Sequence, residues 1–207
     1  MDEKMKNNNV LLTGKIVSEP EYSHEVYGEQ FYNLFLDVNR KSDIADVIPL
    51  TISERLFDVS KECIGTVISV SGQLRSFNRH EKSKNRLILS VFVRDIEIIT
   101  DEYEDENEIM LDGFICKDVV YRKTPLKREI ADLLIAVNRS YGKSDYIPCI
   151  CWGRNARFAS TFPVGTHVQC IGRIQSRGYI KKYEDGTEEQ RTAYEVSVSK
   201  IDVLEGK

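Results

Sequence analysis

The sequence repeats itself at an offset of about one hundred residues. Three blocks recur at an offset of 99, residues 12–16 as 111–115, 38–40 as 137–139 and 48–49 as 147–148. Further along, Gly65-Thr66 recurs as Gly165-Thr166 at an offset of 100, and residues 93–96 recur as 198–201 at 105. The offset therefore grows at only two places, both in predicted loops. Blocks in the same order with so few insertions indicate a duplication, so we expect two tandem copies.

The two copies meet at an acidic segment. Six of the eight residues 101–108 are Asp or Glu. Such a run repels itself and cannot bury apolar surface, so it is predicted to be an exposed linker. We place the domain boundary near residue 104, with an N-terminal module over 1–104 and a C-terminal module over 105–207.

Each copy has the pattern of short β-strands. Apolar segments separated by Gly, Pro, Asp or Ser predict strands at 10–17, 31–39, 47–52, 66–74 and 86–99, and at 109–116, 130–138, 146–152, 166–175 and 192–204. A short helix is predicted after each third strand, over Glu54–Lys61 and Asn155–Thr161. This order favours an all-β fold of two tandem five-stranded OB-fold barrels over a sandwich.

Composition and motifs exclude several functional classes. Hydrophobic residues make up 41% and charged residues 30%, which is typical of soluble globular proteins. The chain has no run of 18 apolar residues and no apolar core of a secretory signal, so we expect a cytoplasmic protein without a membrane partner. Its five cysteines form no C-x-x-C pair, so they are expected to be reduced thiols, with no metal or cofactor bound. No catalytic motif occurs, so no enzyme is expected.

Five stretches of the second copy carry a specific signature, namely residues 136–139, 145–156, 165–168, 172–179 and 191–196. They resemble, in order, the bacterial single-stranded DNA-binding protein family. The first copy shares the scaffold positions and much less of this signature. The resemblance implies binding of single-stranded DNA without strong sequence preference, in DNA replication, recombination or repair, through bases that stack on aromatic side chains across one barrel face.

By position, the family's stacking residues would fall on Tyr141, Tyr146, Trp152 and Tyr179. Strand alternation supports part of this, because Tyr146 and Trp152 share one face of the third strand while the small apolar residues Ile147, Cys149 and Cys151 share the other. The cations expected to contact phosphates are Arg139, Arg154, Arg173, Arg177, Lys181, Lys182 and Arg191. Residues 182–191 are predicted to be a hairpin tip, whose acidic middle suits phosphate poorly.

The first copy lacks these aromatic residues. The equivalent positions hold Ser42, Val47, Ser53 and Arg79. Residues 1–106 carry 13 Lys+Arg against 20 Asp+Glu, a net charge of −7, whereas residues 107–207 carry 16 against 13, a net charge of +3. We therefore expect the first module to serve mainly in pairing, as a pseudo-dimer within the chain or in a homodimer. Phe77 and the basic residues Arg75, Arg79, Lys82, Lys84 and Arg86 are its remaining candidates for nucleic-acid contact.

The sequence departs from the family in one respect. The family typically has a flexible tail with an acidic tip that recruits replication proteins, whereas this chain ends at Lys207 directly after the last predicted strand. We therefore expect a tail-less variant, in which recruitment of replication proteins through a tip is in doubt. Three alternatives stay open: a primosome-type accessory protein, an OB-fold protein that binds RNA, and an adaptor that docks other proteins.

Overall fold

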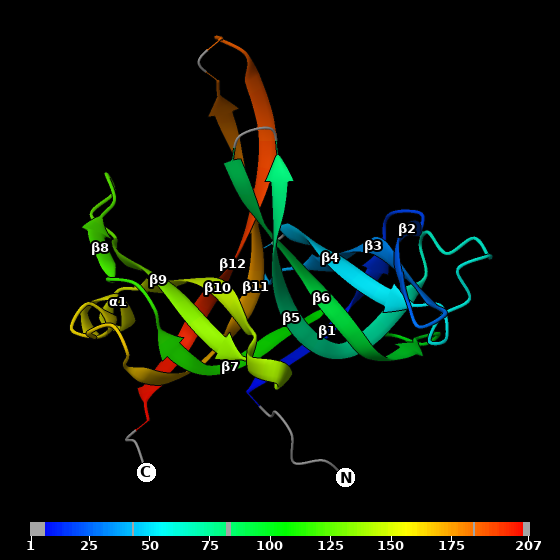
Figure 1. The fold of residues 1–207 in the computed structure, drawn as a ribbon, viewed down its shortest axis with the longest axis horizontal. Helices are drawn as coiled ribbons and strands as arrows, with labels where there is room; N and C mark the ends of the chain where they lie inside the picture. The colour runs from blue at the N-terminus through cyan, green and yellow to red at the C-terminus, as the bar shows by residue number, and fades with distance from the viewer. Residues whose placement is uncertain (1–6, 43, 82–83, 184, 205–207) are drawn as a thin grey trace.

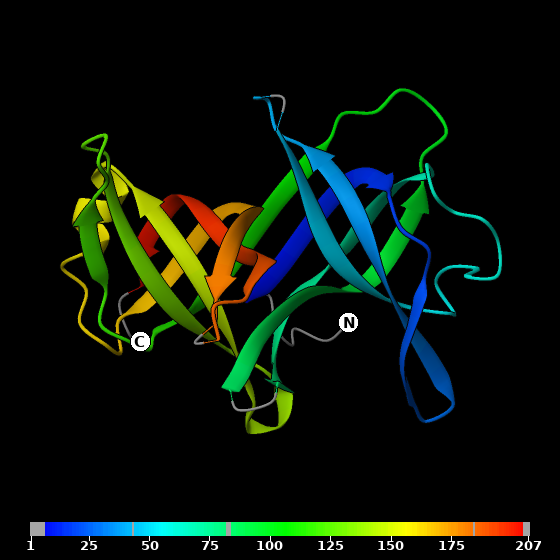
Figure 2. The ribbon, with the colours of Figure 1, turned by 90° about the horizontal axis from the view of Figure 1, so that it is seen from above.

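The computed structural model describes residues 7–42, 44–81, 84–183 and 185–204, without the side chains of residues 80, 81, 84, 85 and 141. The described chain is nearly all β, and its strands form one continuous sheet in the order β2-β3-β4-β6-β5-β1-β7-β11-β12-β10-β9-β8. Figure 2 shows the two halves of this sheet curled into separate barrels, one at each end of the molecule. The predicted all-β fold class is confirmed.

The first barrel is built from the first half of the chain. Its strands are β1 (Asn8–Ile16), β2 (Glu21–Val26), β3 (Glu29–Asn39), β4 (Ala45–Ser53), β5 (Val67–Glu81) and β6 (Lys84–Ile98). The barrel closes because β1 pairs with both β5 and β3, and because β4 pairs with β6 in parallel. Five strands thus form the ring, which is the OB-fold arrangement.

The second barrel repeats this topology. Its elements are β7 (Glu106–Ile115), β8 (Val120–Lys123), β9 (Glu129–Asn138), the 3-10 helix η1 (Ser140–Gly142), β10 (Ser144–Trp152), α1 (Arg154–Ala159), β11 (His167–Lys182) and β12 (Glu188–Val203). Here β7 pairs with β11 and β9, and β10 pairs with β12 in parallel. The two closed rings are therefore equivalent strand by strand.

Glycines at equivalent places allow the rings to close. A Cβ atom on Gly14 would lie 2.3 Å from the carbonyl oxygen of Asp37, and one on Gly113 would lie 2.5 Å from that of Ala136. Only a residue without a side chain lets β1 approach β3, and β7 approach β9, so closely. This explains why both copies of the repeated block keep a glycine.

The predicted helix over Glu54–Lys61 is wrong, because these described residues form turns and bends. Asp58 accepts hydrogen bonds from the backbone N–H and the hydroxyl of Ser60, a local arrangement that competes with a helix. In the second module, α1 buries Ala156 and Ala159. The first module has Phe57 and Ser60 at these positions, and these are poorer helix formers than alanine.

Two strands were missed, and β5 and β11 each continue seven residues beyond their predicted ends at 74 and 175. The short strands β2 and β8 pair with β3 and β9 outside the rings, and all their residues are exposed, so no apolar alternation marked them. Strands β5 and β6, and likewise β11 and β12, continue past the barrels as two-stranded ribbons that rise from the centre of the molecule (Figure 1). The two ends of the predicted hairpin tip, residue 182 and residues 188–191, are thus part of a ribbon.

The acidic join is only partly the exposed linker that we predicted. Residues 99–105 lie between β6 and β7, but Glu106, Asn107 and Glu108 are the first residues of β7 and pair with β1. The Asn107 side chain also donates to the carbonyl oxygen of Ile174 at 2.7 Å and accepts from its N–H at 2.8 Å. Backbone pairing therefore holds this end of the join despite its charge.

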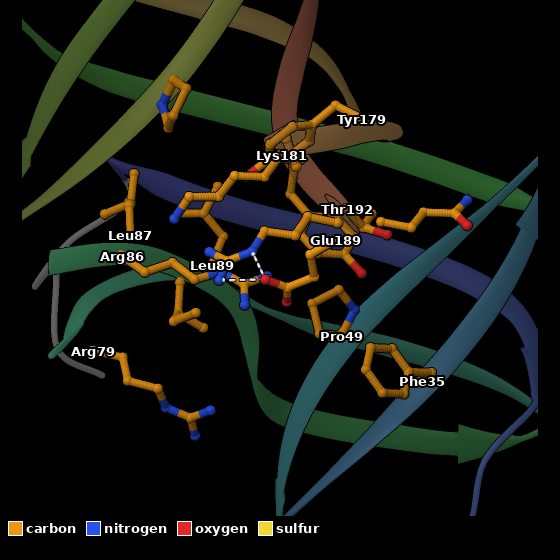
Figure 3. Close-up of a pocket in the computed structure, with 16 residues that line it drawn as sticks. Phe35, Pro49, Arg79, Arg86, Leu87, Leu89, Tyr179, Lys181, Glu189 and Thr192 are labelled. Atoms are coloured by element: carbon orange, nitrogen blue, oxygen red, sulfur yellow. Dashed lines mark hydrogen bonds and ion pairs between the residues drawn. The ribbon is translucent and has the colours of Figure 1, made fainter. Parts of the chain in front are cut away.

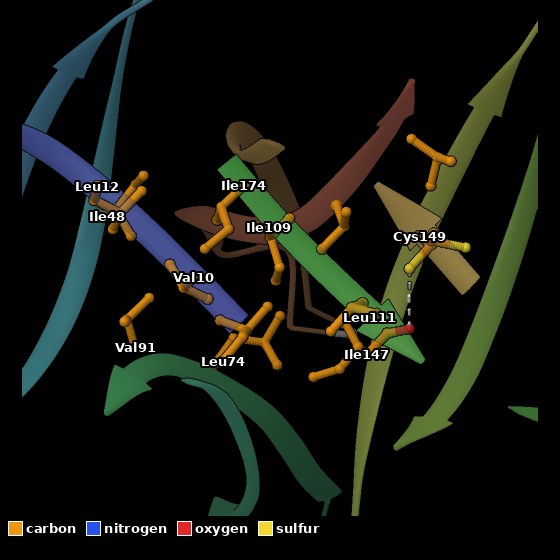
Figure 4. Close-up of a cluster of buried hydrophobic side chains, with 14 of the residues drawn as sticks. Val10, Leu12, Ile48, Leu74, Val91, Ile109, Leu111, Ile147, Cys149 and Ile174 are labelled. Carbon is orange, nitrogen blue, oxygen red and sulfur yellow. Dashed lines mark hydrogen bonds between the residues drawn. The ribbon is translucent and has the colours of Figure 1, made fainter. Parts of the chain in front are cut away.

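Strands β1 and β7 carry one core through both modules. They pair antiparallel, and the buried side chains of β1 and β7 belong to a single hydrophobic cluster that extends into both barrels (Figure 4). No helix among the described residues is long and apolar enough to cross a membrane.

Candidate nucleic-acid interface

The outer face of β10 carries two exposed aromatic rings. Tyr146 is 47% exposed and Trp152 39% exposed, whereas Ile147, Cys149 and Cys151 on the other face are buried. The predicted alternation is therefore confirmed for these residues. Tyr146 lies opposite the small Ala136 of β9, and Trp152 lies opposite the buried Ile130. The neighbouring strand thus leaves both rings open to solvent.

The ribbon of β11 and β12 provides the third predicted ring. Tyr179 is 38% exposed and lies opposite Arg191 in the ribbon. Lys181 follows two residues later, and its Nζ lies 4.9 Å from the centroid of the Tyr183 ring. Lys182 forms an exposed ion pair with Glu188 at 2.8 Å. Exposed pairs of this kind are weak and yield readily to phosphate.

Arg177 and Arg154 also lie on the surface of the second module. The Arg177 side chain is 63% exposed, and its Nε lies 4.0 Å from Glu195. Arg154 is exposed at the first residue of α1. It follows Gly153, whose φ of +54° turns the chain from β10 into the helix. Both cations are accessible to a ligand.

Two other predicted cations are held by carboxylates of the protein. The side chain of Arg191 is only 8% exposed, and it donates to Glu189 at 2.9 Å and to the Tyr183 hydroxyl at 2.9 Å. The hydrogen bonds from Tyr183 and then Arg191 lower the pKa of Glu189, so this carboxylate stays ionised. Arg139 lies 3.4 Å from the buried carboxylate of Asp145. Both arginines therefore have structural partners.

The last two predicted residues lie elsewhere. Arg173 lines a separate groove of about 950 Å³ beside Glu104, Asp105 and Glu106 of the acidic join. Its buried Nε has no hydrogen-bond partner among the described residues. Tyr141 lies in η1, and its side chain is outside the described part of the chain.

A buried carboxylate in each module bonds to the ribbon of the other module. Asp145 accepts from the N–H of Ser76 at 2.7 Å, and Asp46 accepts from the N–H of Ser176 at 2.7 Å. Both side chains are fully buried, and they occupy equivalent positions of the repeat. The two ribbons are thus each anchored on the opposite barrel.

The counter-ions of these carboxylates differ between the modules. Arg40 donates two hydrogen bonds to Asp46, at 2.7 and 2.6 Å, and this contact raises the pKa of Arg40. Asp145 instead pairs with Arg75 of the first module at 2.9 Å, in addition to Arg139. Burial lowers the pKa of Arg75, while the hydrogen bond to Asp145 opposes this shift. Arg75 is therefore part of the contact between the modules.

A groove of about 840 Å³ lies between the two ribbons (Figure 3). One wall carries Arg79 and Arg86 of the first module, and the other carries Tyr179, Lys181 and Arg191 of the second. The groove therefore brings together three of the predicted site residues and two of the basic candidates of the first module.

Sequence reasoning missed an aromatic side chain in this groove. Phe35 lies on β3, is 40% exposed and faces Pro49 of β4 across the strand pair. The alternation of β3 already indicated it, because Leu34 and Leu36 are buried and Phe35 falls on the opposite face. Phe77 is likewise exposed, at 49%.

The cysteines are free thiols that lie mostly in the core. All five are unpaired, and no group of three or more His, Cys, Asp or Glu residues there could hold a metal ion. Burial raises the pKa of Cys151 to about 12 and also raises the pKa values of Cys149 and Cys170. Such thiols stay protonated and unreactive at neutral pH.

The two closed five-stranded rings define an OB-fold protein, and exposed aromatic residues lie on the outer face of β10. The chain belongs to the single-strand binding protein family, whose family model matches residues 106–204. "Single-stranded DNA-binding protein B" of Bacillus subtilis (strain 168) is 34% identical over 80 residues, which cover 35% of this chain and 71% of that protein.

Other similar proteins extend this comparison. "Single-stranded DNA-binding protein 1" of Streptococcus pyogenes serotype M18 is 34% identical over 80 residues, 35% of this chain and 62% of that protein. This chain thus spans about three fifths of the length of several curated relatives. The crystal structure of the wild-type single-stranded DNA binding protein from Thermus aquaticus matches with a TM-score of 0.73, at 18% identity, over 97% of this chain and 94% of that chain. At this identity the match shows a shared fold across both modules.

Proposed function

We propose that this protein binds single-stranded DNA without strong sequence preference, mainly through the second module. The observation that carries the proposal is the pair of exposed rings, Tyr146 and Trp152, on the outer face of β10. A tryptophan exposed on a barrel surface loses apolar burial, which a stacked base would restore. Each stacked base contributes about 1–3 kcal/mol, and every base has a face that can stack, so binding tolerates any sequence.

The proposed contact surface combines rings with cations. Tyr146, Trp152 and Tyr179 are its stacking residues, with Tyr141 as a fourth on the basis of its position in the sequence. Its cations are Arg154, Arg177, Lys181 and Lys182, all on the second module. Their charges would follow the phosphates and release counter-ions, which makes the affinity fall as salt rises.

Three predicted cations are left out of this surface. Arg139 and Arg191 form ion pairs with Asp145 and Glu189, so phosphate would have to compete with a carboxylate of the chain for each of them. Arg173 lies in the separate groove beside the acidic join, where phosphate would be repelled. We infer that these residues stabilise the fold or the join.

We further propose that the chain acts by binding rather than by catalysis, in DNA replication, recombination or repair. The division at residue 104 is supported by the separate closure of the two rings on either side of it. The pairing of β1 with β7 makes the chain a pseudo-dimer of OB modules. Association of two chains into a homodimer, contacts with replication proteins and a cytoplasmic location stay predictions.

The proposal is tested by titrating the protein with a poly-dT oligonucleotide of about 10 nucleotides, within the site size of one OB fold. Trp152 is the single tryptophan of the chain, so its emission reports on β10 alone. We expect quenching and an affinity that falls as salt rises. Binding without quenching would remove Trp152 from the site, and no binding at low salt would overturn the function. Poly-rU of the same length measures the preference for DNA over RNA.

A further inference from the structure

The groove between the ribbons is lined by residues of both modules. Its walls are equivalent in the repeat, since Arg79 corresponds to Tyr179 and Pro49 to Pro148. The backbone of the two walls is therefore the same, while their side chains differ. A ligand in this groove would meet both modules at once.

The lining of the groove is basic and contains aromatic rings. Among the described lining residues, four are Lys or Arg, namely Arg79, Arg86, Lys181 and Arg191, and Glu189 is the one carboxylate. That carboxylate is bonded to Arg191. Burial raises the pKa of Tyr194, and the charge of Arg86 opposes this rise, so Arg86 acts on the second module across the groove. The first module, with its net charge of −7, thus presents cations here.

The groove also connects the outer faces of the two barrels. Pro148 lines it and lies two residues from Tyr146 on β10. At the other end, Pro49 lines it and pairs directly with Phe35, whose ring is 40% exposed. Phe35, Pro49, Arg79 and Tyr179 line this one groove (Figure 3). A strand that leaves the Tyr146 ring and passes Pro148 can therefore cross between the ribbons and reach the Phe35 ring.

We propose that this groove is the path by which one nucleic-acid strand passes from the second module to the first, with Arg79 and Arg86 binding its phosphates and Phe35 stacking a base. This inference rests on the proposed function and extends it to the first module, whose inherited stacking positions are lost. The first module then takes part in binding through residues that differ from those of the second.

The test compares poly-dT of about 10 and about 30 nucleotides, lengths that fit one and two OB folds, with protein in excess. Arg79→Ala/Arg86→Ala is expected to bind the short strand like the wild type and to lose about tenfold or more in affinity for the long one. Its salt slope for the long strand should fall by about 1.4, since each phosphate contact contributes about 0.7 for single strands. Arg55→Ala/Lys61→Ala, which removes two exposed cations from the turn after β4, is the matched control and should change neither.

A second measurement follows tryptophan emission from the groove, so that its result does not depend on whether the arginine variant is less stable. Phe35→Trp in a Trp152→Phe background places the single tryptophan in the groove, and the long strand is expected to quench it. Absence of quenching, or an unchanged length dependence in Arg79→Ala/Arg86→Ala, overturns the proposal. If the groove proposal fails in this way but the wild type binds the short strand with quenching of Trp152, the proposed function is still supported. If the wild type binds neither strand, both fail.

Discussion

Val10 of β1 lies directly opposite Ile109 of β7, which is its own equivalent in the repeat. The residues around them pair reciprocally, Asn8 with Leu111 and Leu12 with Asn107. This is the pairing of a two-fold symmetric dimer, made here within one chain. Val10 and Ile109 are both buried in the shared core.

This shared core predicts that the modules unfold together. Leu50→Ala, at a fully buried site of the first module, should destabilise the protein by about 2–5 kcal/mol. The urea midpoint reported by Trp152, in the second module, should fall with it. Ile98→Ala, at a 57% exposed site, is the control. A Trp152 transition that does not move would show that the modules unfold independently.

The buried carboxylate of Asp46 is expected to be essential for stability. Asp46→Ala leaves Arg40 without its counter-ion and Ser176 without an acceptor, a loss of about 3–5 kcal/mol for breaking a buried pair. Urea denaturation measures it. Asp58→Ala, at an exposed turn, should leave the midpoint nearly unchanged, and an equally small effect of both variants would contradict the prediction.

Replacement of the exposed rings should weaken DNA binding in proportion to lost stacking. Trp152→Ala and Tyr179→Ala are each expected to reduce the affinity for short poly-dT by about tenfold to a hundredfold, the equivalent of about 1–3 kcal/mol per base. Trp152→Phe should lose less, because a ring remains. Tyr27→Ala removes a fully exposed ring of the first module and should have no effect. Anisotropy of a labelled oligonucleotide measures all four variants.

The acidic join is expected to compete with DNA for the cations of the proposed contact surface on the second module. Asp101, Glu102 and Glu104 are exposed between β6 and β7, so Asp101→Asn/Glu102→Gln/Glu104→Gln should keep the fold and raise the affinity at low salt. The gain should shrink as salt screens the charges. Unchanged affinity at low salt would rule this competition out.

The cysteine thiols should be nearly inert in the folded protein. Burial raises the pKa of Cys151 to about 12 and that of Cys63 and Cys116 above the usual value. At pH 8 the reactive thiolate is therefore scarce, and its fraction should grow as the pH rises. Titration with DTNB should be slow for the native protein and should count five thiols in urea. Cys116, the least buried, should react first. Rapid native reaction of all five would contradict the burial.

Much of the fold and part of the site could be read from local patterns. The repeat gave two modules, and apolar alternation placed the ring strands, including the outward faces of Tyr146 and Trp152. These features depend on residues close in sequence, because a strand's two faces follow from its period of two. The ribbon parts of β5 and β11 and the short strands β2 and β8 were not predicted, since residues exposed on both sides leave no such period.

What the sequence by itself determined is the duplicated barrel and which rings face outward. Only the tertiary structure decided which cations are available, by placing Arg139 against Asp145 and Arg191 against Glu189. It also decided that each ribbon rests on the opposite barrel, so that Arg79 and Tyr179 line one groove. The two ion pairs join residues only six and two positions apart, but strand periodicity does not specify side-chain pairs. The ribbon contacts join segments 69 and 130 residues apart. Their formation depends on how β1 and β7 pair, and no local periodicity encodes that pairing.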